Sequence, residues 1–136
     1  MRFSTGSVVI TAPIGVPLAG NGRADAASRG IHDDLRANIL YMESQGQRLV
    51  FISLDLLGLL QKHCDAIKDR ICEKSGIARE GINIFATHTH SGPNTLRIFD
   101  YFLTQEQLDE CDRYLEGLVP TVAEAALDVI AKAQPG

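Results

Sequence analysis

The stretch "LVFISLDLLGLLQKHCDAIKDRICEKSGIAREGINIFA" (residues 49–86) decides the fold. It opens with a run that is apolar on both faces, which is typical of a central strand covered on both sides. Apolar residues then recur at spacings of four, three and four, which predicts one face of a helix: Leu60, Cys64, Ile67 and Ile71. Gly76 is a natural helix stop, and "INIFA" (residues 82–86) is the next strand. A strand, a helix and a strand with short connections predict a crossover unit with two parallel strands.

Polar residues follow both strands of this unit. Asp55 comes directly after the first strand, and the segment Thr87–His90 comes directly after the second. Parallel neighbouring strands have their carboxyl ends at the same edge of a sheet. We therefore expect these residues to lie together at that edge. In open α/β sheets, that edge is where ligand sites form.

The residues upstream predict further strands. Leu35–Glu43 and Arg48–Asp55 form two β runs joined by the short turn Ser44–Gln47, which predicts an antiparallel hairpin. Residues 6–12 are rich in β-branched side chains and predict another strand, closed by Pro13. The stretch from Pro13 to Asp34 shows no helical period, and loops of this length often carry function.

The residues downstream predict helix. Thr104 and Gln107 have the spacing of a capping box. A helical stripe of apolar residues follows, which Pro120 is expected to kink or break: Leu108, Cys111, Leu115, Leu118, Val122 and Val129. The prediction is therefore an α/β fold. It consists of a mixed sheet of about four strands with two or more helices packed on it, in a single domain spanning residues 1–136. Because so small a sheet ends abruptly, we expect the chain to be part of a longer protein.

Composition narrows the class of protein. The chain has 136 residues, is 45% hydrophobic and carries a net charge of -4, which argues against a nucleic-acid surface. No apolar run is long enough to span a membrane, and the amino terminus lacks the pattern of a signal peptide. We therefore expect a cytoplasmic protein rather than a secreted or periplasmic one. The three cysteines form no C-x-x-C pair and are expected to be small buried thiols.

The segment "FATHTHSGPNT" (residues 85–95) places two of the four histidines two residues apart. In an extended chain, His88 and His90 would point to the same side, with Cα atoms about 6.5 Å apart. They can converge on one metal ion, or one can bind it while the other transfers protons. Thr87 and Thr89 would face the other way and support the imidazoles with their hydroxyls. By itself the pattern is more typical of a polar loop, and its position at the end of a buried strand, beside another strand that ends in Asp55, makes the two interpretations about even.

A zinc site needs a further protein ligand. The candidates are His32, Asp33, Asp55 and His63. His63 is expected to be a solvated residue of the helix surface. His32 either lines a pocket or only binds its acidic neighbours. Asp55 either orients an imidazole or caps the helix that follows it.

The residues around the histidine pair resemble a known family. The segments "GSVVITAPIGVPLAGNGR" (6–23), "GIHDDLRAN" (30–38), "LVFISLDLLG" (49–58) and "ATHTHSGP" (86–93) occur in this order. Together they resemble the amino-terminal part of the neutral/alkaline non-lysosomal ceramidase family, over nearly the whole chain.

This resemblance implies a zinc-dependent amidase that cleaves the N-acyl bond of ceramide. It implies that His88 is a zinc ligand and that His90 lies beside the metal and the substrate as a catalytic residue. The residues themselves, apart from the resemblance, predict that Ser91 and Gly92 form a compact turn with free backbone N–H groups. The family's other ligands, a His, a Glu and a Tyr, and its serine have no match in these 136 residues. The resemblance therefore implies one half of a site in a hydrolase, which binds zinc weakly by itself, with a small-molecule or lipid amide as the substrate.

Two other interpretations stay open. The chain can be a different metallohydrolase, in which both histidines bind the metal together with Asp55 or His32. It can also be a non-catalytic binding or assembly module that retains the fold. If the chain is part of a longer protein, self-association through an exposed sheet edge is expected for this part alone.

Overall fold

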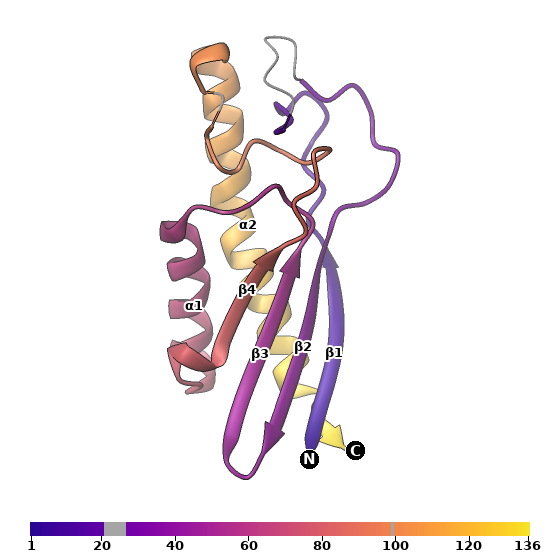
Figure 1. Cartoon of the computed structure of the whole chain (residues 1–136), viewed down its shortest axis with the longest axis vertical. Helices are drawn as coiled ribbons and strands as arrows, with labels where there is room; N and C mark the ends of the chain where they lie inside the picture. Colours follow the sequence, from indigo (N-terminus) through magenta and orange to yellow (C-terminus); the bar gives the residue numbers. More distant parts are fainter. Residues whose placement is uncertain (21–26, 99) are drawn as a thin grey trace.

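A computed structural model describes residues 1–20, 27–98 and 100–136. Along the chain its elements are β1 (Arg2–Val9), β2 (Arg36–Ser44), β3 (Gln47–Leu54), α1 (Gln61–Ser75), the 3₁₀ turn η1 (Arg79–Gly81), β4 (Ile82–Ala86), the 3₁₀ turn η2 (Asp100–Phe102), α2 (Gln105–Ala131) and β5 (Gln134–Pro135). The strands form one mixed sheet in the order β4-β3-β2-β1-β5 (Figure 1). The predicted fold class is confirmed.

The crossover unit forms as predicted. β3 and β4 are parallel neighbours, with Val50 opposite Ile82 and Leu54 opposite Ala86. Gly76 ends α1 in the left-handed conformation (φ 66°), and its N–H donates to the carbonyl of Cys72. The parallel pairing of β3 and β4 and the helix stop therefore both follow from the pattern in residues 49–86.

The hairpin is also confirmed. β2 and β3 are antiparallel, and Ser44 and Gln47 are their last pair. The turn residues Gln45 and Gly46 both have positive φ angles, 50° and 77°. This geometry matches the right-handed twist of the flanking strands, and a glycine adopts it without steric cost.

Both ends of the chain differ from the prediction. The first strand spans Arg2–Val9 rather than residues 6–12, because its pairing with β2 begins at Arg2 opposite Glu43. The unpredicted strand β5 pairs with the same end of β1, with Gln134 opposite Phe3.

Helix α2 runs without a break through Pro120. The predicted capping box is present at its start: Thr104 Oγ1 accepts from the Gln107 N–H, and Gln107 Oε1 accepts from the Thr104 N–H. Neither described helix is both long enough and apolar enough to cross a membrane.

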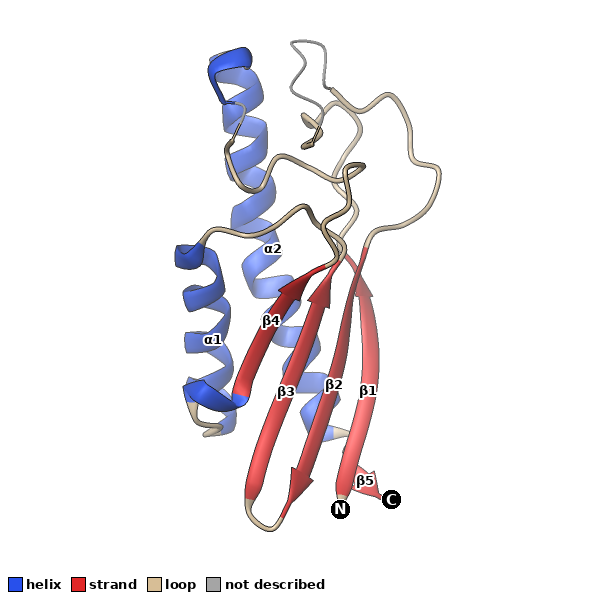
Figure 2. Ribbon diagram, viewed as in Figure 1, coloured by secondary structure: helices blue, strands red, loops and turns tan. Residues whose placement is uncertain are grey.

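Both helices cover the same face of the sheet, as Figure 2 shows for α2 behind the strands. Val50, Ile52 and Leu54 of β3 are fully buried in one core with residues of α1 and α2. Their neighbours Leu49, Phe51 and Ser53 point to the other face and are only partly buried. The expectation that β3 is covered on both sides is therefore wrong for this chain, because no element of the described residues packs on the second face.

Candidate functional site at the carboxyl ends of the parallel strands

The parallel strands end side by side, as their pairing predicts. Beyond the last pair, the Thr87 N–H donates to the carbonyl of Leu54 (2.9 Å) and the His88 N–H to that of Leu56 (3.0 Å). The loop after β4 is therefore fastened to the loop after β3. Asp55 and the histidine segment lie at the same edge of the sheet.

His88 and His90 lie next to each other at this edge. Their ring centroids are 5.4 Å apart and the rings are tilted by 58°. Both residues are exposed. The reason for their proximity differs from the expected one, because His88 has a φ angle of 63° and the chain turns there instead of staying extended. Histidine is one of the few residues that adopt this left-handed conformation with some frequency.

A second loop lies directly against His90. A Cβ atom on Gly20 would lie 2.5 Å from Cγ of His90, so only a glycine fits at this contact. Gly20 also has a φ angle of 91°, which favours glycine. Sequence reasoning missed this role of Gly20. The sequence signal that could have indicated this contact is the glycine-rich composition of the loop that begins at Pro13.

Backbone hydrogen bonds hold the two loops together. The Ala19 N–H donates to the carbonyl of Gly92 (2.8 Å), and the Asn94 N–H donates to that of Pro17 (2.9 Å). This pairing encloses the segment that follows His90. Gly92 is buried, and a Cβ atom there would lie 3.4 Å from the carbonyl oxygen of Asp55. The position of His90 is therefore set from both sides by backbone.

Asp55 contributes to the edge in a way that was not predicted. Its Oδ2 accepts a hydrogen bond from the backbone N–H of Arg36 (3.0 Å), which ties the start of β2 to the end of β3. Helix α1 has Leu60 at its N-cap position and no side-chain cap. The interpretation of Asp55 as a helix cap is therefore wrong, and its role in orienting an imidazole stays a prediction.

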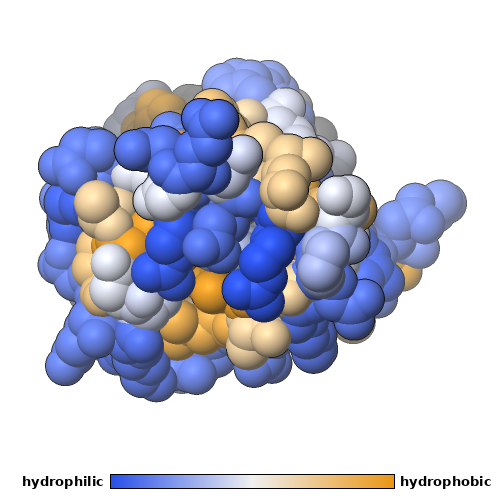
Figure 3. Space-filling model, turned by 90° about the horizontal axis from the view of Figure 1, so that it is seen from below, coloured by the Kyte–Doolittle hydropathy of each residue, from blue (hydrophilic) through white to orange (hydrophobic). Residues whose placement is uncertain are grey.

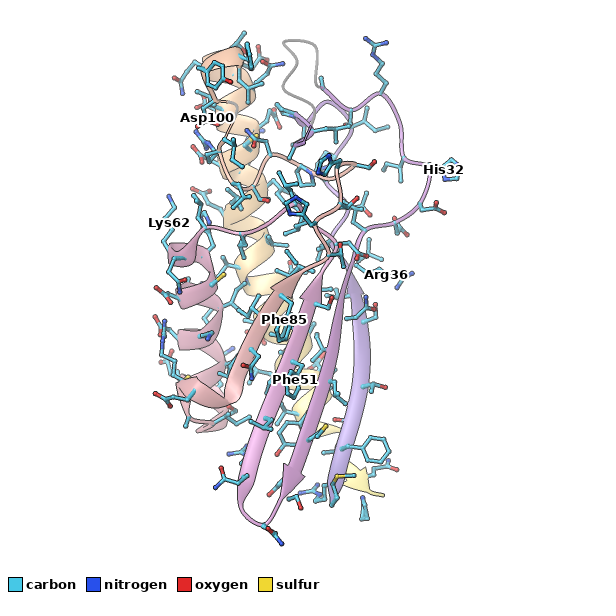
Figure 4. The ribbon with its side chains drawn as sticks, viewed as in Figure 1. His32, Arg36, Phe51, Lys62, Phe85 and Asp100 are labelled. Carbon is cyan, nitrogen blue, oxygen red and sulfur yellow. The ribbon has the colours of Figure 1, made fainter. Side chains whose placement is uncertain are left out.

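His32 lies far out on its loop. Its Nδ1 is 2.7 Å from Oδ2 of Asp33, and the two side chains are 97% and 87% exposed. Figure 4 shows His32 projecting away from the sheet. The structure shows both predicted roles, because His32 contacts its acidic neighbour and also lines the cavity described next.

A cavity of about 460 Å³ lies between this loop and the histidine loop. His32, Asp33, Thr89 and Ser91 line it, together with apolar residues that include Leu18. Two of the predicted supporting groups are used within the loop itself, because the Ser91 N–H donates to Thr89 Oγ1 (3.3 Å). The prediction of a free Ser91 N–H is therefore wrong. Thr87, the other threonine of the segment, is exposed to solvent.

His63 is not a solvated surface residue, contrary to expectation. It is half-buried, and its Nδ1 is shielded from water without a hydrogen-bond partner among the described residues. Burial lowers the pKa of His63, and the positive charge of Lys62 lowers it further. His63 and Lys62 line a hollow of about 410 Å³ together with Asp112 and Glu116 of α2.

The buried polar residues Asn94 and Thr95 were also missed. Thr95 Oγ1 donates to the carbonyl of Gly58 (2.5 Å), and Asn94 Nδ2 donates to Oδ1 of Asp100 (3.2 Å). They fix the far end of the histidine loop.

Within residues 1–20, 27–98 and 100–136, no three His, Cys, Asp or Glu side chains are grouped so that they could hold a metal ion. A third ligand from His32, Asp33, Asp55 or His63 is therefore not in place.

The fold and this edge define the class: an α/β domain with a pair of histidines at the carboxyl end of two parallel strands. Two solved structures are similar to it. Neutral ceramidase from Pseudomonas aeruginosa is 25% identical with a TM-score of 0.79, and a ceramidase complexed with C2 is 25% identical with a TM-score of 0.78. Each alignment covers 99% of this chain and 22% of the ceramidase chain. No family model and no curated protein matches the sequence.

Proposed function

We propose that this chain is the histidine-bearing amino-terminal part of a zinc-dependent hydrolase, which cleaves an N-acyl bond of a ceramide-like or other amide when complete. The observation that carries the proposal is the pair His88 and His90, 5.4 Å apart at the carboxyl edge of the parallel strands. The likeness to neutral ceramidase over 99% of this chain supports it. Because the chain spans only 22% of that protein, the remaining machinery is expected from other sequence.

The histidine pair fits one side of a zinc site. A zinc bound to one imidazole at 2.0–2.1 Å lies close to a second imidazole whose ring centroid is roughly 5 Å from the first. The separation of His88 and His90 is near this value, so a zinc held by His88 would lie beside His90. One imidazole ligand leaves most of a four-coordinate shell unfilled, so we expect weak binding by the chain alone.

The two histidines have different proposed roles. Zinc, when bound, polarises a carbonyl group and makes a bound water more acidic. His88 supplies a ring nitrogen as the ligand. His90 transfers a proton or donates a hydrogen bond to the oxygen that becomes negatively charged. The close contact with Gly20 keeps the His90 ring in place for this task.

Zinc titration of the chain with a competing chromogenic chelator tests the proposal. We expect weak binding of one zinc per chain, which falls at least tenfold in His88→Asn. Asparagine is the appropriate replacement, because it tolerates the left-handed backbone of residue 88. The matched control His32→Asn changes an exposed histidine outside the pair and should bind like the wild type. Equal binding by all three proteins would contradict the role of His88.

Hydrolysis of an N-acyl substrate is the second measurement. We expect none from the 136-residue chain. Hydrolysis that is lost in His88→Asn would show that the site is complete without further sequence. It would thereby contradict the proposed half-site.

A non-catalytic assembly module is the second candidate, and the lack of a three-ligand group in the described part of the chain favours it. A natural reading frame that continues well past residue 136 and supplies a further His, Glu and Tyr would favour the hydrolase instead.

The third interpretation, with Asp55 or His32 as the remaining ligand, has lost its support. Asp55 binds the backbone of Arg36, and His32 points into solvent beside Asp33.

A further inference from the structure

The hollow that contains His63 lies between the start of α1 and the first half of α2. His63 is half-buried there, and its Nδ1 is shielded from water without a hydrogen-bond partner among the described residues. A proton added to this ring would place a charge in a shielded position without an acceptor for it. The uncharged ring is therefore the form that suits the hollow.

Charged groups surround this hollow. Asp112 and Glu116 line it from α2, and Lys62 lines it beside His63 in α1. Burial lowers the pKa of His63, and the positive charge of Lys62 lowers it further. The negative charge of Asp112 acts in the opposite direction, while the positive charge of Arg97, in the histidine loop, also lowers the pKa. Asp112 is therefore the charge that would stabilise a protonated His63.

Asp112 already binds a residue of the histidine loop. Its Oδ1 accepts a hydrogen bond from Nη1 of Arg97, and Nε of Arg97 donates to Oδ2 of Asp100 (2.7 Å). Arg97 has a φ angle of 58°, a left-handed conformation that residues other than glycine seldom adopt. The two carboxylates therefore hold a backbone turn that the chain does not favour by itself.

The same network continues to the segment beside the histidine pair. Oδ1 of Asp100 accepts from Nδ2 of Asn94 (3.2 Å), and the Asn94 N–H donates to the carbonyl of Pro17 (2.9 Å). Asn94 is only 1% exposed. Pro17 belongs to the loop in which Gly20 contacts His90. This chain of contacts thus ends at the loop that holds His90.

The two ends of the helix pair are held together differently. At the end of α1, Nζ of Lys74 lies 2.5 Å from Oε1 of Glu124 in α2. The surface at this end of the molecule, near the hairpin turn and the chain termini, is mostly hydrophilic with apolar patches near the middle (Figure 3). At the start of α1, near Lys62 in Figure 4, the hollow of about 410 Å³ lies between the helices. A change of charge at His63 therefore acts on the end that faces the histidine loop.

We propose that His63 is a pH-sensitive switch that controls how firmly the histidine loop is held to α2. At neutral pH, Asp112 binds Arg97 and His63 is uncharged. Protonation makes His63 compete with Arg97 for the carboxylate of Asp112, and its positive charge repels the guanidinium. Acid therefore loosens the left-handed turn at Arg97 and the contacts of Asn94. The switch involves neither zinc nor His88, so it does not rest on the proposed function.

Amide hydrogen exchange followed by NMR tests the switch, with the rates corrected for the intrinsic effect of pH. In the wild type, the protection of the Asn94 amide should fall several-fold between about pH 7.5 and 5, a range that brackets the ordinary pKa of histidine. The amides of β3, in the middle of the sheet, should lose less protection. An equal fall at Asn94 and in β3 would indicate global unfolding and overturn the proposal.

Three variants assign the response to the proposed groups. His63→Gln should keep the protection of Asn94 at neutral pH and lose the fall in acid. Asp112→Asn should show low protection at every pH, because a neutral amide binds Arg97 more weakly than a carboxylate does. The matched control Glu116→Gln removes the other carboxylate of the hollow and should respond like the wild type.

Other outcomes would overturn the proposal. A full acid response in His63→Gln would assign the effect to another group, such as the histidine pair. Loss of the response in Glu116→Gln, or wild-type behaviour of Asp112→Asn, would contradict the role of Asp112. The unmodified chain covers the case in which a variant fails to fold. Its His63 ring signals should titrate with the same midpoint as the protection of Asn94, and different midpoints would exclude the switch.

Discussion

The two faces of this sheet both carry large apolar side chains, but their surroundings are opposite. On the helix side, Ile39, Val50 and Ile52 are at most 2% exposed. On the face opposite the helices, which no described element covers, Phe3 and Phe85 are about half exposed. The strands alternate between the two sides, so adjacent residues differ only in what lies above them. Apolar character therefore indicates that a strand face is suited to burial, while the number of helices decides which face is buried.

The largest expected effect is on the covered side, at Ile52. Ile52→Ala leaves a cavity among fully packed neighbours and should lower the free energy of unfolding by about 3 kcal/mol. Phe51→Ala, one residue along, removes a partly exposed ring and its stack with Phe85, and should cost about 1 kcal/mol. Urea unfolding at low protein concentration measures both values. Equal losses would mean that both faces are covered.

The next effect comes from crowding on the covered side. A Cβ atom on Gly6 would lie 2.5 Å from Cγ2 of Val129 in α2. Gly6→Ala should therefore force the helix or the valine to move, at a cost of about 1–2 kcal/mol. The neighbouring Ser7 lies on the face opposite the helices, and Ser7→Ala should stay within about 0.5 kcal/mol. Thermal unfolding of the two variants compares them. A stabilised Gly6→Ala would show that α2 packs less tightly than described.

A smaller effect concerns the outer side of the helix layer. Because the pKa of His63 is lowered in the folded chain, the unfolded chain binds a proton more readily. Stability should therefore fall as the pH drops below the unfolded pKa of about 6.5. His63→Gln should flatten this loss between about pH 7.5 and 5. Lys62→Gln removes a nearby positive charge and should give an intermediate slope. Parallel profiles for all three proteins would contradict this interpretation.

The smallest effect is on the reactivity of the thiols. Burial raises the pKa of Cys111 to about 11, so little thiolate forms at pH 8. Cys64 has a raised pKa as well but is only half-buried. Alkylation followed by mass spectrometry should label Cys111 last in the native chain. In denaturant, the cysteines should react at similar rates. Early labelling of native Cys111 would show that α2 opens readily.

Local sequence patterns predicted much of the fold correctly. The stop at Gly76, the turn at Gln45 and Gly46 and the capping box of Thr104 each depend on a few adjacent residues. Their geometry is set by backbone sterics and short-range hydrogen bonds, so it can be predicted without tertiary structure. The parallel pair β3–β4 followed from the handedness and length of the crossover.

The failures have a common physical cause, which is packing between distant segments. Pro120 was expected to kink or break α2. The helix does not break there, since Leu118, Val119 and Val122 around it are buried, and the kink stays a prediction. Thr121 Oγ1 also donates to the carbonyl of Gly117 (2.8 Å). The early start of β1 likewise depends on a partner far away in the sequence, because β5 lies at the other end of the chain.

The candidate site was predicted in location but not in construction. The sequence indicated that Asp55 and the histidines share an edge, because parallel strands end together. It did not indicate the left-handed turn at His88, the contact of Gly20 with His90 or the burial of His63. Each of these features depends on a loop or helix that packs from elsewhere.

The sequence by itself determined the order of the elements, the strand crossover and the edge at which the two histidines lie. Periodicity and turn chemistry are properties of neighbouring residues, so they fix these features before the chain is compact. Only the tertiary structure decided which face of the sheet is covered, how His90 is held and which of the remaining histidines is shielded from water. Those features follow from the limited number of helices and from steric contacts between residues far apart in the chain.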